Sequence, residues 1–479
     1  PMAYNPDVND TQVTVGTGIG LTFDHRILAG SGNVTLSVAT NAGAAGTTVE
    51  NFGVGSSVTI AGRKVTIDPA SDLTEGETYH ISYPSGSFTN TGGDVDYVGT
   101  AYTFGMLKFN RSFFSMGGND YGALGQNNSG DSNRKSSPTQ IPGIKWNQVA
   151  KGGTGEAWTA AIQSDGTLWS WGRNEFGMSG QNDTTAYSSP RQVGSDTTWA
   201  NVEKSRWTTF AVKTDGTLWT FGTNAFGELA NNTGAGAHVS SPVQVPGTSW
   251  STEYGHISGG ARQLAAIKTD GTLWIWGRNN KGQLGQNSGS NANRSSPVQI
   301  PGTTWRTVSA GYQSTCATKT DGTMWIWGMN HQGQLGQNNT TYYSSPVQIP
   351  GTTWSKGHAS GGSKTTIAVK TDGTLWSWGY NNYGNMGNNS STSYFSSPVQ
   401  IGSGTDWSTD YQKVINGKSG SISAAIKTDG TMWVWGQNHV GQLGLNDTTQ
   451  RSSPTQIPGT DFHTAGVANA ALFIIKRSS

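Results

Sequence analysis

Histidine, cysteine and carboxylate side chains could carry chemistry in this 479-residue chain, but their spacing forms no catalytic or metal-binding motif. The eight histidines occur singly, and none belongs to the HExxH pattern that binds zinc on a helix. Cys316 is the only cysteine, so there is neither a disulfide framework nor a cysteine-based metal site. No Gly-x-Ser-x-Gly nucleophile elbow occurs in a strand–turn–helix setting. We therefore expect a non-enzymatic protein without a cofactor.

Two weaker metal or base candidates have simpler explanations. His331 and His439 share one position, directly after a recurring asparagine, where other copies of the segment carry Asp120, Glu175, Ala225, Asn280 and Asn382. Such free variation favours a solvated loop over a metal ligand or a catalytic base. Asp94 and Asp96 offer oxygen ligands for calcium, but no calcium-loop pattern follows them, which favours an ordinary turn. The sequence therefore predicts no metal site.

The composition narrows the class of protein. Charged residues make up 12% of the chain and the net charge is +1, so no basic patch for nucleic acid is visible. No apolar run approaches the roughly 18 residues of a membrane span, so we expect no membrane insertion. The N-terminus has no basic segment followed by an apolar one, so we also expect no signal peptide. Low charge with abundant Gly, Thr and Asn is typical of extracellular or virion β-proteins.

A motif of the form Trp-Gly-x-Asn-x-x-Gly recurs about every 50 residues, which is the spacing of propellers and solenoids. Its seven copies begin at Met116, Trp171, Phe221, Trp276, Trp327, Trp378 and Trp435. An Asp-Gly pair between two apolar runs precedes six of them, and it predicts two-residue type I′ hairpin turns. These pairs begin at Asp165, Asp215, Asp270, Asp321, Asp372 and Asp429.

The rest of each repeat completes a four-stranded unit. Alternation places Trp274 and Trp276 on one face of a strand and Leu273 and Ile275 on the other, so both faces are apolar, as in a sheet between two neighbouring sheets. A later Ser-Ser-Pro-x-Gln segment is bounded by prolines in most copies, which predicts an edge strand. Each repeat thus contains about four short strands, the usual content of a propeller blade.

The two ends of the repeat region complement each other. There are seven Gly-x-Asn motifs but only six Asp-Gly hairpins, because the copy around Phe113 lacks the preceding Ala-Ala-Ile-Lys strand. Residues 470–477, Ala-Ala-Leu-Phe-Ile-Ile-Lys-Arg, supply such a strand at the other end of the chain. We therefore expect the C-terminal strand to pair near Phe113 and to close the ring, which removes an open sheet edge.

Residues 1–105 lack the repeat and alternate as short strands. Ile19, Leu21 and Phe23 alternate with polar residues, and the same pattern recurs at Val34 to Val38, Val65 to Ile67 and Tyr79 to Tyr83. Short alternating strands over such a length suggest a β-sandwich. Leu21-Thr-Phe-Asp and Leu73-Thr-Glu-Gly-Glu-Thr-Tyr are among the segments that resemble the bacterial Ig-like domains of S-layer and other surface proteins. That resemblance implies a spacer or attachment module.

Residues 106–479 resemble the regulator of chromosome condensation repeat family, on motifs such as Trp276-Gly-Arg-Asn-Asn-Lys-Gly-Gln-Leu-Gly. The resemblance implies a seven-bladed β-propeller, and the whole chain is expected to be all-β. The family includes an exchange factor, a plant photoreceptor and a β-lactamase inhibitor, so the fold implies no single function. The absence of a basic patch disfavours the exchange factor, and the repeat-locked tryptophans are expected to serve packing rather than light sensing. An inhibitor stays open.

Variable positions beside the recurring asparagine and before Ser-Ser-Pro carry aromatic and arginine residues, the types that anchor interfaces and stack on sugars. The candidate binding surface comprises Arg173, Arg278, Tyr380, Tyr383, Tyr187, Tyr342, Tyr343, Tyr394 and Phe395. The sequence is equally compatible with the alternative that these side chains only cover neighbouring loops on the same face.

The combined features favour a structural or binding protein on a bacteriophage virion, in a tail, fibre or capsid decoration. Its expected partners are other virion proteins and a host-surface glycan or protein; homo-oligomerisation is compatible with the sequence. The alternatives are a bacterial cell-surface or extracellular protein, either an adhesin or a sheath or filament subunit, and a secreted protein inhibitor. All of these place the protein on a virion, on a cell surface or outside the cell.

Overall fold

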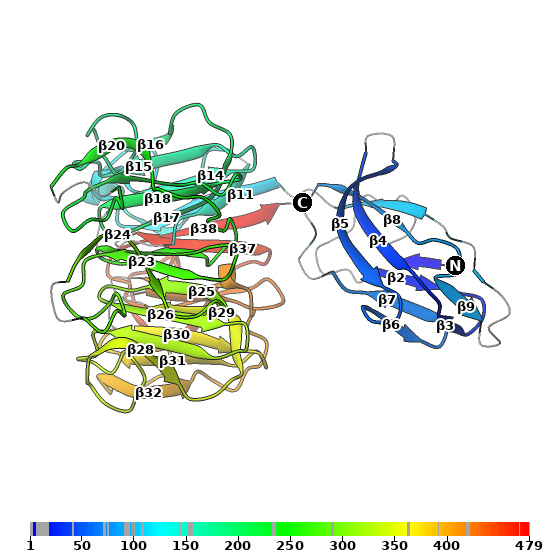
Figure 1. Ribbon diagram of the computed structural model, residues 1–479. Helices are drawn as coiled ribbons and strands as arrows, with labels where there is room; N and C mark the ends of the chain where they lie inside the picture. The colour runs from blue at the N-terminus through cyan, green and yellow to red at the C-terminus, as the bar shows by residue number, and fades with distance from the viewer. Residues whose placement is uncertain are drawn as a thin grey trace. The chain divides into compact units, whose positions relative to one another are not determined.

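The computed structural model describes residues 3–5, 19–40, 43–69, 73, 76–90, 96–97, 99, 101–106, 110–143, 145–151, 157–231, 236–288, 292–361, 365–390, 392–417, 422–468 and 470–478. The chain forms two compact units, Pro1–Asn110 and Arg111–Ser478. Both are built of β-strands (Figure 1), and the described helices are the 3-10 turns η1 (Asp120–Gly122), η2 (Asp131–Asn133) and η3 (Tyr411–Lys413). None of these helices is long and apolar enough to cross a membrane.

In its described residues, the first unit contains two four-stranded antiparallel sheets and one short pair of strands. The sheets have the orders β1-β2-β7-β6 and β10-β8-β4-β5, and β3 pairs with β9. The strands are β1 (Ala3–Asn5), β2 (Ile19–Thr22), β3 (Ile27–Ala29), β4 (Asn33–Ala39), β5 (Ala45–Gly53), β6 (Val58–Ala61), β7 (Lys64–Ile67), β8 (Thr78–Ser82), β9 (Phe88–Asn90) and β10 (Ala101–Gly105).

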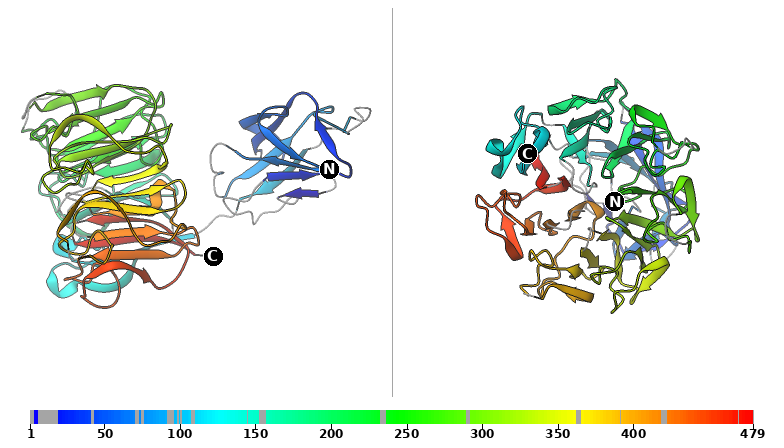
Figure 2. Two further views of the ribbon diagram at one scale, coloured as in Figure 1. Left: turned by 90° about the horizontal axis from the view of Figure 1, so that it is seen from below. Right: turned by 90° about the vertical axis from the view of Figure 1, so that its left-hand side faces the viewer.

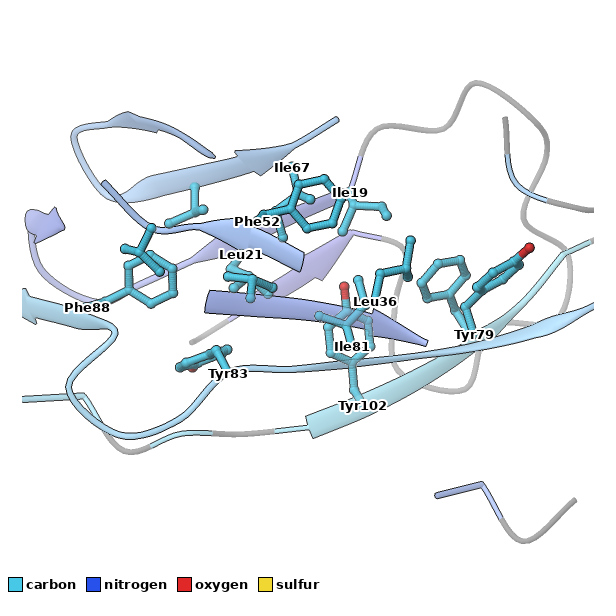
Figure 3. Packing of buried hydrophobic residues seen from close by; sticks show 14 of the residues in the cluster. Ile19, Leu21, Leu36, Phe52, Ile67, Tyr79, Ile81, Tyr83, Phe88 and Tyr102 are labelled. Carbon is cyan, nitrogen blue, oxygen red and sulfur yellow. The ribbon is translucent and has the colours of Figure 1, made fainter. Parts of the chain in front are cut away.

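The alternating apolar residues of this unit form its core (Figure 3). Leu21, Leu36 and Ile81 lie between the sheets with at most 1% of their surface exposed. Aromatic rings fill one side, where Phe23 and Phe88 lie 5.2 Å apart between ring centres. The expected β-sandwich core is confirmed: strands such as β7 and β8 bury every second side chain, and these side chains meet between the two sheets.

The second unit consists of seven four-stranded sheets, the blades (Figure 1). Blade 1 has the order β12-β11-β38-β37, formed by β11 (Asn110–Gly117), β12 (Lys135–Ile141), β37 (Phe462–Ala468) and β38 (Ala471–Ser478). Blades 2 to 7 follow in chain order, each with four consecutive strands. Blade 2 contains β13 (Trp146–Val149), β14 (Trp158–Gln163), β15 (Leu168–Gly172) and β16 (Tyr187–Gln192), and blade 3 contains β17 (Trp199–Lys204), β18 (Thr208–Lys213), β19 (Leu218–Gly222) and β20 (Val239–Gln244). Blade 4 contains β21 (Ile257–Gly259), β22 (Gln263–Ile267), β23 (Leu273–Gly277) and β24 (Arg294–Ile300), and blade 5 contains β25 (Trp305–Ala310), β26 (Ser314–Lys319), β27 (Met324–Gly328) and β28 (Tyr343–Ile349). Blade 6 contains β29 (Trp354–Gly361), β30 (Thr365–Lys370), β31 (Leu375–Tyr380) and β32 (Tyr394–Gln400), and blade 7 contains β33 (Val414–Asn416), β34 (Ile422–Ile426), β35 (Met432–Gly436) and β36 (Arg451–Ile457).

The innermost strands of consecutive blades, which lie opposite the proline-bounded edge strands, contact one another around a complete ring. The ring runs from β13 through β17, β21, β25, β29 and β33 to β37 and back to β13. The right-hand view of Figure 2 shows the blades arranged around this centre. The proline-bounded strands, such as β24, are the outer edge strands, as their sequence predicts. The second unit is therefore a seven-bladed β-propeller.

The ring closes within blade 1. Strand β38, from the end of the chain, lies between β11 and β37, and Gly118 donates its backbone N–H to the Ala470 carbonyl at 2.9 Å. The rings of Phe113 and Phe473 are 5.9 Å apart between centres. The expected pairing partners are thus side by side, and neither strand presents an open edge.

Each Asp-Gly hairpin contains a hydrogen-bond relay. The Asp270 carboxylate accepts the backbone N–H of Thr272 at 3.0 Å and its hydroxyl at 2.6 Å, and that hydroxyl accepts the indole N–H of Trp274 at 2.9 Å. The predicted type I′ turn is wrong: Gly271 has a φ of +76°, but the aspartate has no positive φ. Backbone bonds between Lys268 and both Gly271 and Thr272 close a three-residue loop instead.

The inner tryptophans join neighbouring blades. Trp276 donates its indole N–H to the backbone oxygen of Glu228 in blade 3 at 2.9 Å, and Trp327 does the same to Gln283 in blade 4 at 2.9 Å. Leu273 and Ile275, on the opposite face of the strand from Trp276, pack in the next cluster, which contains Trp327. Each blade therefore has two apolar faces, as the alternation predicts.

The recurring asparagine shapes the loop that follows it. In blade 5 the side-chain oxygen of Asn330 accepts the N–H of Leu335 at 2.8 Å, and its side-chain nitrogen donates to the Asn339 carbonyl at 3.0 Å. Asn174 and Asn438 make the same pair of bonds in their blades. The recurring residues are thus engaged in packing and turns, as their recurrence predicts.

Candidate binding surface

Each blade has two ends that differ in sequence variation. The hairpin end carries the Asp-Gly turns and the connections to the next blade. The loop end carries the connections from first to second strand and from third to fourth strand, because the strands are antiparallel. All nine candidate binding residues lie at the loop end: Tyr187, Tyr342, Tyr343, Tyr394, Phe395, Arg173, Arg278, Tyr380 and Tyr383.

Three of these tyrosines form a cluster on blade 6. Tyr380 at the end of β31 is directly opposite Tyr394 at the start of β32, and the Tyr383 ring lies 6.3 Å from the Tyr380 ring. Tyr383 is 38% exposed and Tyr394 is 48% exposed. Burial raises the pKa of Tyr380. The cluster offers aromatic faces and hydroxyl donors to a partner.

A second cluster connects blades 1, 2 and 3 through an arginine. The Arg173 guanidinium lies 4.9 Å from the centre of the Tyr121 ring and 4.8 Å from that of Trp207. It also pairs with Glu175 at 2.5 Å, and Phe176 packs edge-on against Trp207 at 4.9 Å. Tyr121 is 51% exposed. Cation–π contacts of this type hold the arginine side chain across the blade boundary.

The same arrangement recurs between blades 3 and 4. Arg278 and Arg262 lie 4.8 and 5.0 Å from the centre of the Phe226 ring. Arg262 also pairs with Glu228 at 3.4 Å, and burial raises the pKa of that carboxyl. Arg278 is therefore part of a second arginine–aromatic cluster at the loop end.

Tyr342 stands at the boundary of blades 4 and 5. Its ring is 42% exposed, and the Lys281 ammonium lies 5.5 Å from the ring centre. Tyr121 and Lys281 occupy the same loop position as Tyr383, two residues after the recurring asparagine. Comparing that position across the copies is the signal that would have added Tyr121 to the predicted residues.

The other three candidates are held within their own blades. The Tyr187 hydroxyl donates to the Asp183 carboxylate, and the Tyr343 hydroxyl accepts the side-chain N–H of Asn339 at 3.0 Å. Phe395 is half-buried as the second residue of β32. The structure therefore joins Tyr380, Tyr383 and Tyr394, but not the whole predicted set, into one cluster.

The residues considered for chemistry are dispersed. The His439 imidazole contacts Gln442 in its own loop at 3.2 Å, and Cys316 is buried. Asp94 lies outside the described residues, and Asp96 forms an isolated β-bridge with Thr89. Over the described part of the chain, no three His, Cys, Asp or Glu residues gather as a metal site.

The centre of the ring contains a feature that sequence analysis missed, here called the central plug and formed by residues 251–256 and 408–413. These segments contain Tyr254 and Tyr411 and lengthen the connections into β21 and β33 of blades 4 and 7. In blade 5 only residues 306–307 occupy the corresponding place between Trp305 and Val308. Aligning the repeats with one another would have shown these two longer connections.

Tyr411, on the connection into blade 7, contacts residues of blades 2 and 4 at the centre of the ring. Lys151 of blade 2 donates its ammonium to the Tyr411 carbonyl at 2.8 Å and lies 4.6 Å from its ring centre. Across the ring, a Cβ on Gly255 would meet the Tyr411 ring at 2.6 Å, so only glycine fits there. Burial raises the pKa of Tyr411 well above its usual value, and burial together with Arg111 lowers the pKa of His463 well below its own.

The family comparisons agree with this architecture. The model of the RCC1-like domain matches residues 87–422, and that of the regulator of chromosome condensation (RCC1) repeat matches residues 429–470. The model of the bacterial Ig-like domain matches residues 2–109.

Similar proteins include two from Arabidopsis thaliana. The ultraviolet-B receptor UVR8 is 26% identical over 361 residues, which are 74% of this chain and 68% of the receptor. The mitochondrial RCC1 domain-containing protein RUG3 is 27% identical over 205 residues, 41% of this chain and 45% of RUG3.

Solved structures show the same fold at low identity. Prp20p of Saccharomyces cerevisiae, which binds Gsp1p and histones, superimposes with a TM-score of 0.66 at 18% identity over 78% of this chain and 92% of Prp20p. Human WBSCR16 gives 0.65 at 18% identity, over 77% of this chain and 99% of its own. The propeller has seven blades in a closed ring, the Trp, Gly and Asn residues recur in its repeats, and family models match both units. The chain therefore belongs to the RCC1-like domain family and carries a bacterial Ig-like domain at its N-terminal side.

Proposed function

We propose that this protein is a non-enzymatic binding protein of a bacteriophage virion, whose propeller contacts a host-surface protein or a neighbouring virion subunit through its loop end. The observation that carries the proposal is the exposure of Tyr121, Tyr342, Tyr383 and Tyr394, at 38 to 51%. Among the described propeller residues, these are the large apolar side chains that solvent reaches most. All four lie at the loop end.

Tyrosine suits a protein interface because it buries a large ring, keeps a hydroxyl for hydrogen bonding and loses little conformational freedom. Arg173 beside Tyr121 and Lys281 beside Tyr342 add cations to the same surface. The similar protein Prp20p binds other proteins, Gsp1p and histones, with this fold. The recurring residues are occupied by packing and turns, which supports a role in binding rather than catalysis.

The location on a virion is supported by the Ig-like domain and by the low share of charged residues, 12%. The alternative, a bacterial cell-surface or extracellular protein, is supported by the same Ig-like match. Immunogold labelling of purified phage particles and of whole cells with an antibody against the full chain separates the two. Label on particles supports the virion proposal, and label confined to cells contradicts it.

The binding surface is tested with fluorescently labelled full-length chain on intact cells of the host strain, before and after protease treatment of the cells. The variant carries Tyr121→Ala, Tyr342→Ala, Tyr383→Ala and Tyr394→Ala; the matched control carries Thr320→Ala and Thr371→Ala at the exposed hairpin end. We expect about a tenfold or greater loss of binding for the tyrosine variant only. Equal binding by both variants would contradict the assignment of the loop end.

A further inference from the structure

Grooves between consecutive blades form a second type of surface, which contains none of the exposed tyrosines of the loop end. They are named here by their lysine: the Lys370 groove has a volume of ≈ 310 Å³, the Lys213 groove ≈ 390 Å³ and the Lys427 groove ≈ 360 Å³. Each is bordered by the segment after the recurring loop of one blade and by the lysine, tryptophan and Ser-Pro residues of the next. Volumes near 300 Å³ are at the lower end of small-molecule sites.

The lysine of each groove is held between two indole rings. The Lys370 ammonium lies 4.0 Å from the Trp376 ring centre and 5.2 Å from that of Trp354. Trp376 is itself fixed, since its indole N–H donates to the Thr374 hydroxyl at 2.8 Å and that hydroxyl donates to Asp372 at 2.7 Å. The hairpin relay therefore also fixes one wall of the groove.

The grooves differ in the charge that faces the lysine. Lys213 pairs with Asp196 at 2.5 Å, and Lys427 pairs with Asp406 at 3.0 Å. In the part of the chain that the structure describes, no carboxylate lies within 4.0 Å of the Lys370 ammonium. Thr353 precedes Trp354, where Asp406 precedes Trp407 in blade 7. One scaffold thus exists in two forms, with and without a carboxylate paired directly to the lysine; in both forms the hairpin aspartate, Asp372 in blade 6, acts on the lysine from farther away.

We propose that the Lys370 groove binds a carboxylate-bearing sugar of the hexuronate class, whose carboxylate takes the place at the ammonium that Asp406 holds in blade 7. A carboxylate on a lysine between two indoles forms a charge-assisted hydrogen bond in a partly water-excluded site. Charge complementarity therefore selects an anion for the Lys370 groove and excludes it from the Lys213 and Lys427 grooves.

The other groove residues favour a sugar over a simple carboxylate. Asn338 accepts the Ser397 hydroxyl on its side-chain oxygen at 3.3 Å, which leaves its side-chain nitrogen to donate. Gln337 donates to the Gln348 carbonyl at 3.1 Å, which leaves its side-chain oxygen to accept. Neutral donors and acceptors of this type match ring hydroxyls, and the apolar edges of Pro350 and Trp376 match the C–H face of a sugar ring.

The lysine between two indoles recurs in further blades. Lys268 and Lys319 sit between indole pairs with the same geometry, at 4.6 to 4.9 Å from the ring centres. A polysaccharide with a uronate at regular intervals would gain avidity by contacting several of these lysines on one ring. This surface is independent of the tyrosines of the loop end.

The test uses the full chain with glucuronate as the probe, glucose as the neutral control and acetate as the simple-carboxylate control, by calorimetry and by saturation-transfer NMR. Thr353→Asp introduces the carboxylate of blade 7 beside Lys370, and Thr353→Ala is the matched uncharged control at the same exposed position. Asp406→Thr removes the carboxylate from the Lys427 groove. Melting temperatures confirm that each variant is folded.

We expect saturable glucuronate binding in the millimolar range, no glucose binding, and about a tenfold loss with Thr353→Asp but not with Thr353→Ala. Asp406→Thr should add a binding site, and about 0.5 M NaCl should weaken all binding. The proposal is overturned if glucuronate does not bind saturably, if glucose or acetate binds equally well, or if the two Thr353 variants bind alike.

Discussion

The two ends of each propeller blade differ in how they use the repeat. At the hairpin end, blades 2 to 7 have the same aspartate–threonine–tryptophan relay. Blades 3 to 7 also have the same lysine between two indoles, where blade 2 has Gln163. At the loop end, the recurring asparagine holds the backbone in the same way, while Tyr383, Lys281 and Phe226 share one position and differ in chemistry. The repeat therefore fixes the scaffold at one end and leaves side chains free to vary at the other.

This contrast predicts that changes in the shared scaffold lower stability, whereas changes at the loop end lower binding at constant stability.

Deleting residues 470–479 should have the largest effect. It removes β38 from the middle of blade 1 and leaves β11 and β37 with open edges. We expect an unfolded or polymerised propeller by light scattering and thermal melting. Deleting only residues 477–479 is the control. A truncated chain that stays monomeric with an unchanged melting temperature would show that β38 does not close the ring.

Substituting Trp276 separates packing from hydrogen bonding. Trp276→Ala should cost about 3–5 kcal/mol in the free energy of unfolding, because the indole is fully buried between blades. Trp276→Phe should cost about 1 kcal/mol for the lost bond to the Glu228 carbonyl, beyond repacking. Phe221 already occupies the equivalent place in blade 3. Denaturant titration measures both, and equal losses would contradict this division.

Acid should weaken the hairpin end. Hydrogen bonds from Thr272 lower the pKa of Asp270, and Lys213 followed by Thr198 lowers the pKa of Asp196 to about 2. A folded-state pKa below the unfolded value stabilises the fold above about pH 4. That stabilisation is lost as the pH falls through the folded-state value.

Melting temperatures should therefore decline between about pH 4 and pH 2. The substitution Thr272→Val should return the pKa of Asp270, followed by carboxyl NMR, toward its usual value. A carboxyl titration that the substitution leaves unchanged would refute the role of the relay.

Tyr383→Ala with Tyr394→Ala should have the smallest effect on stability, within about 0.5 kcal/mol per site, because both rings are exposed. The same pair should reduce binding to host cells. A large fall in melting temperature would mean that the cluster supports blade 6 rather than a partner.

Specific residues show which structural features the sequence predicts and which it does not. Recurring tryptophans, alternating strands and proline-bounded edges predicted the blades, and the missing strand near Phe113 predicted the pairing with residues 470–477. The turn type was missed, because the Asp-Gly pair indicates where the chain reverses, whereas the threonine two residues after the aspartate determines how. The central plug was missed because the copies were compared at their shared positions rather than at their longer connections.

The sequence by itself determined the local and periodic features: strand alternation, turn positions, the number of repeats and the variable loop positions. These follow from burial on alternate residues and from short-range hydrogen bonding, which each repeat encodes on its own. Only the tertiary structure decided which variable side chains meet, as Arg173 meets Tyr121 and Trp207, or Tyr411 meets Lys151 across the ring. Such contacts depend on the radius of the ring and the rotation of each blade, which are set by the packing of all seven blades together.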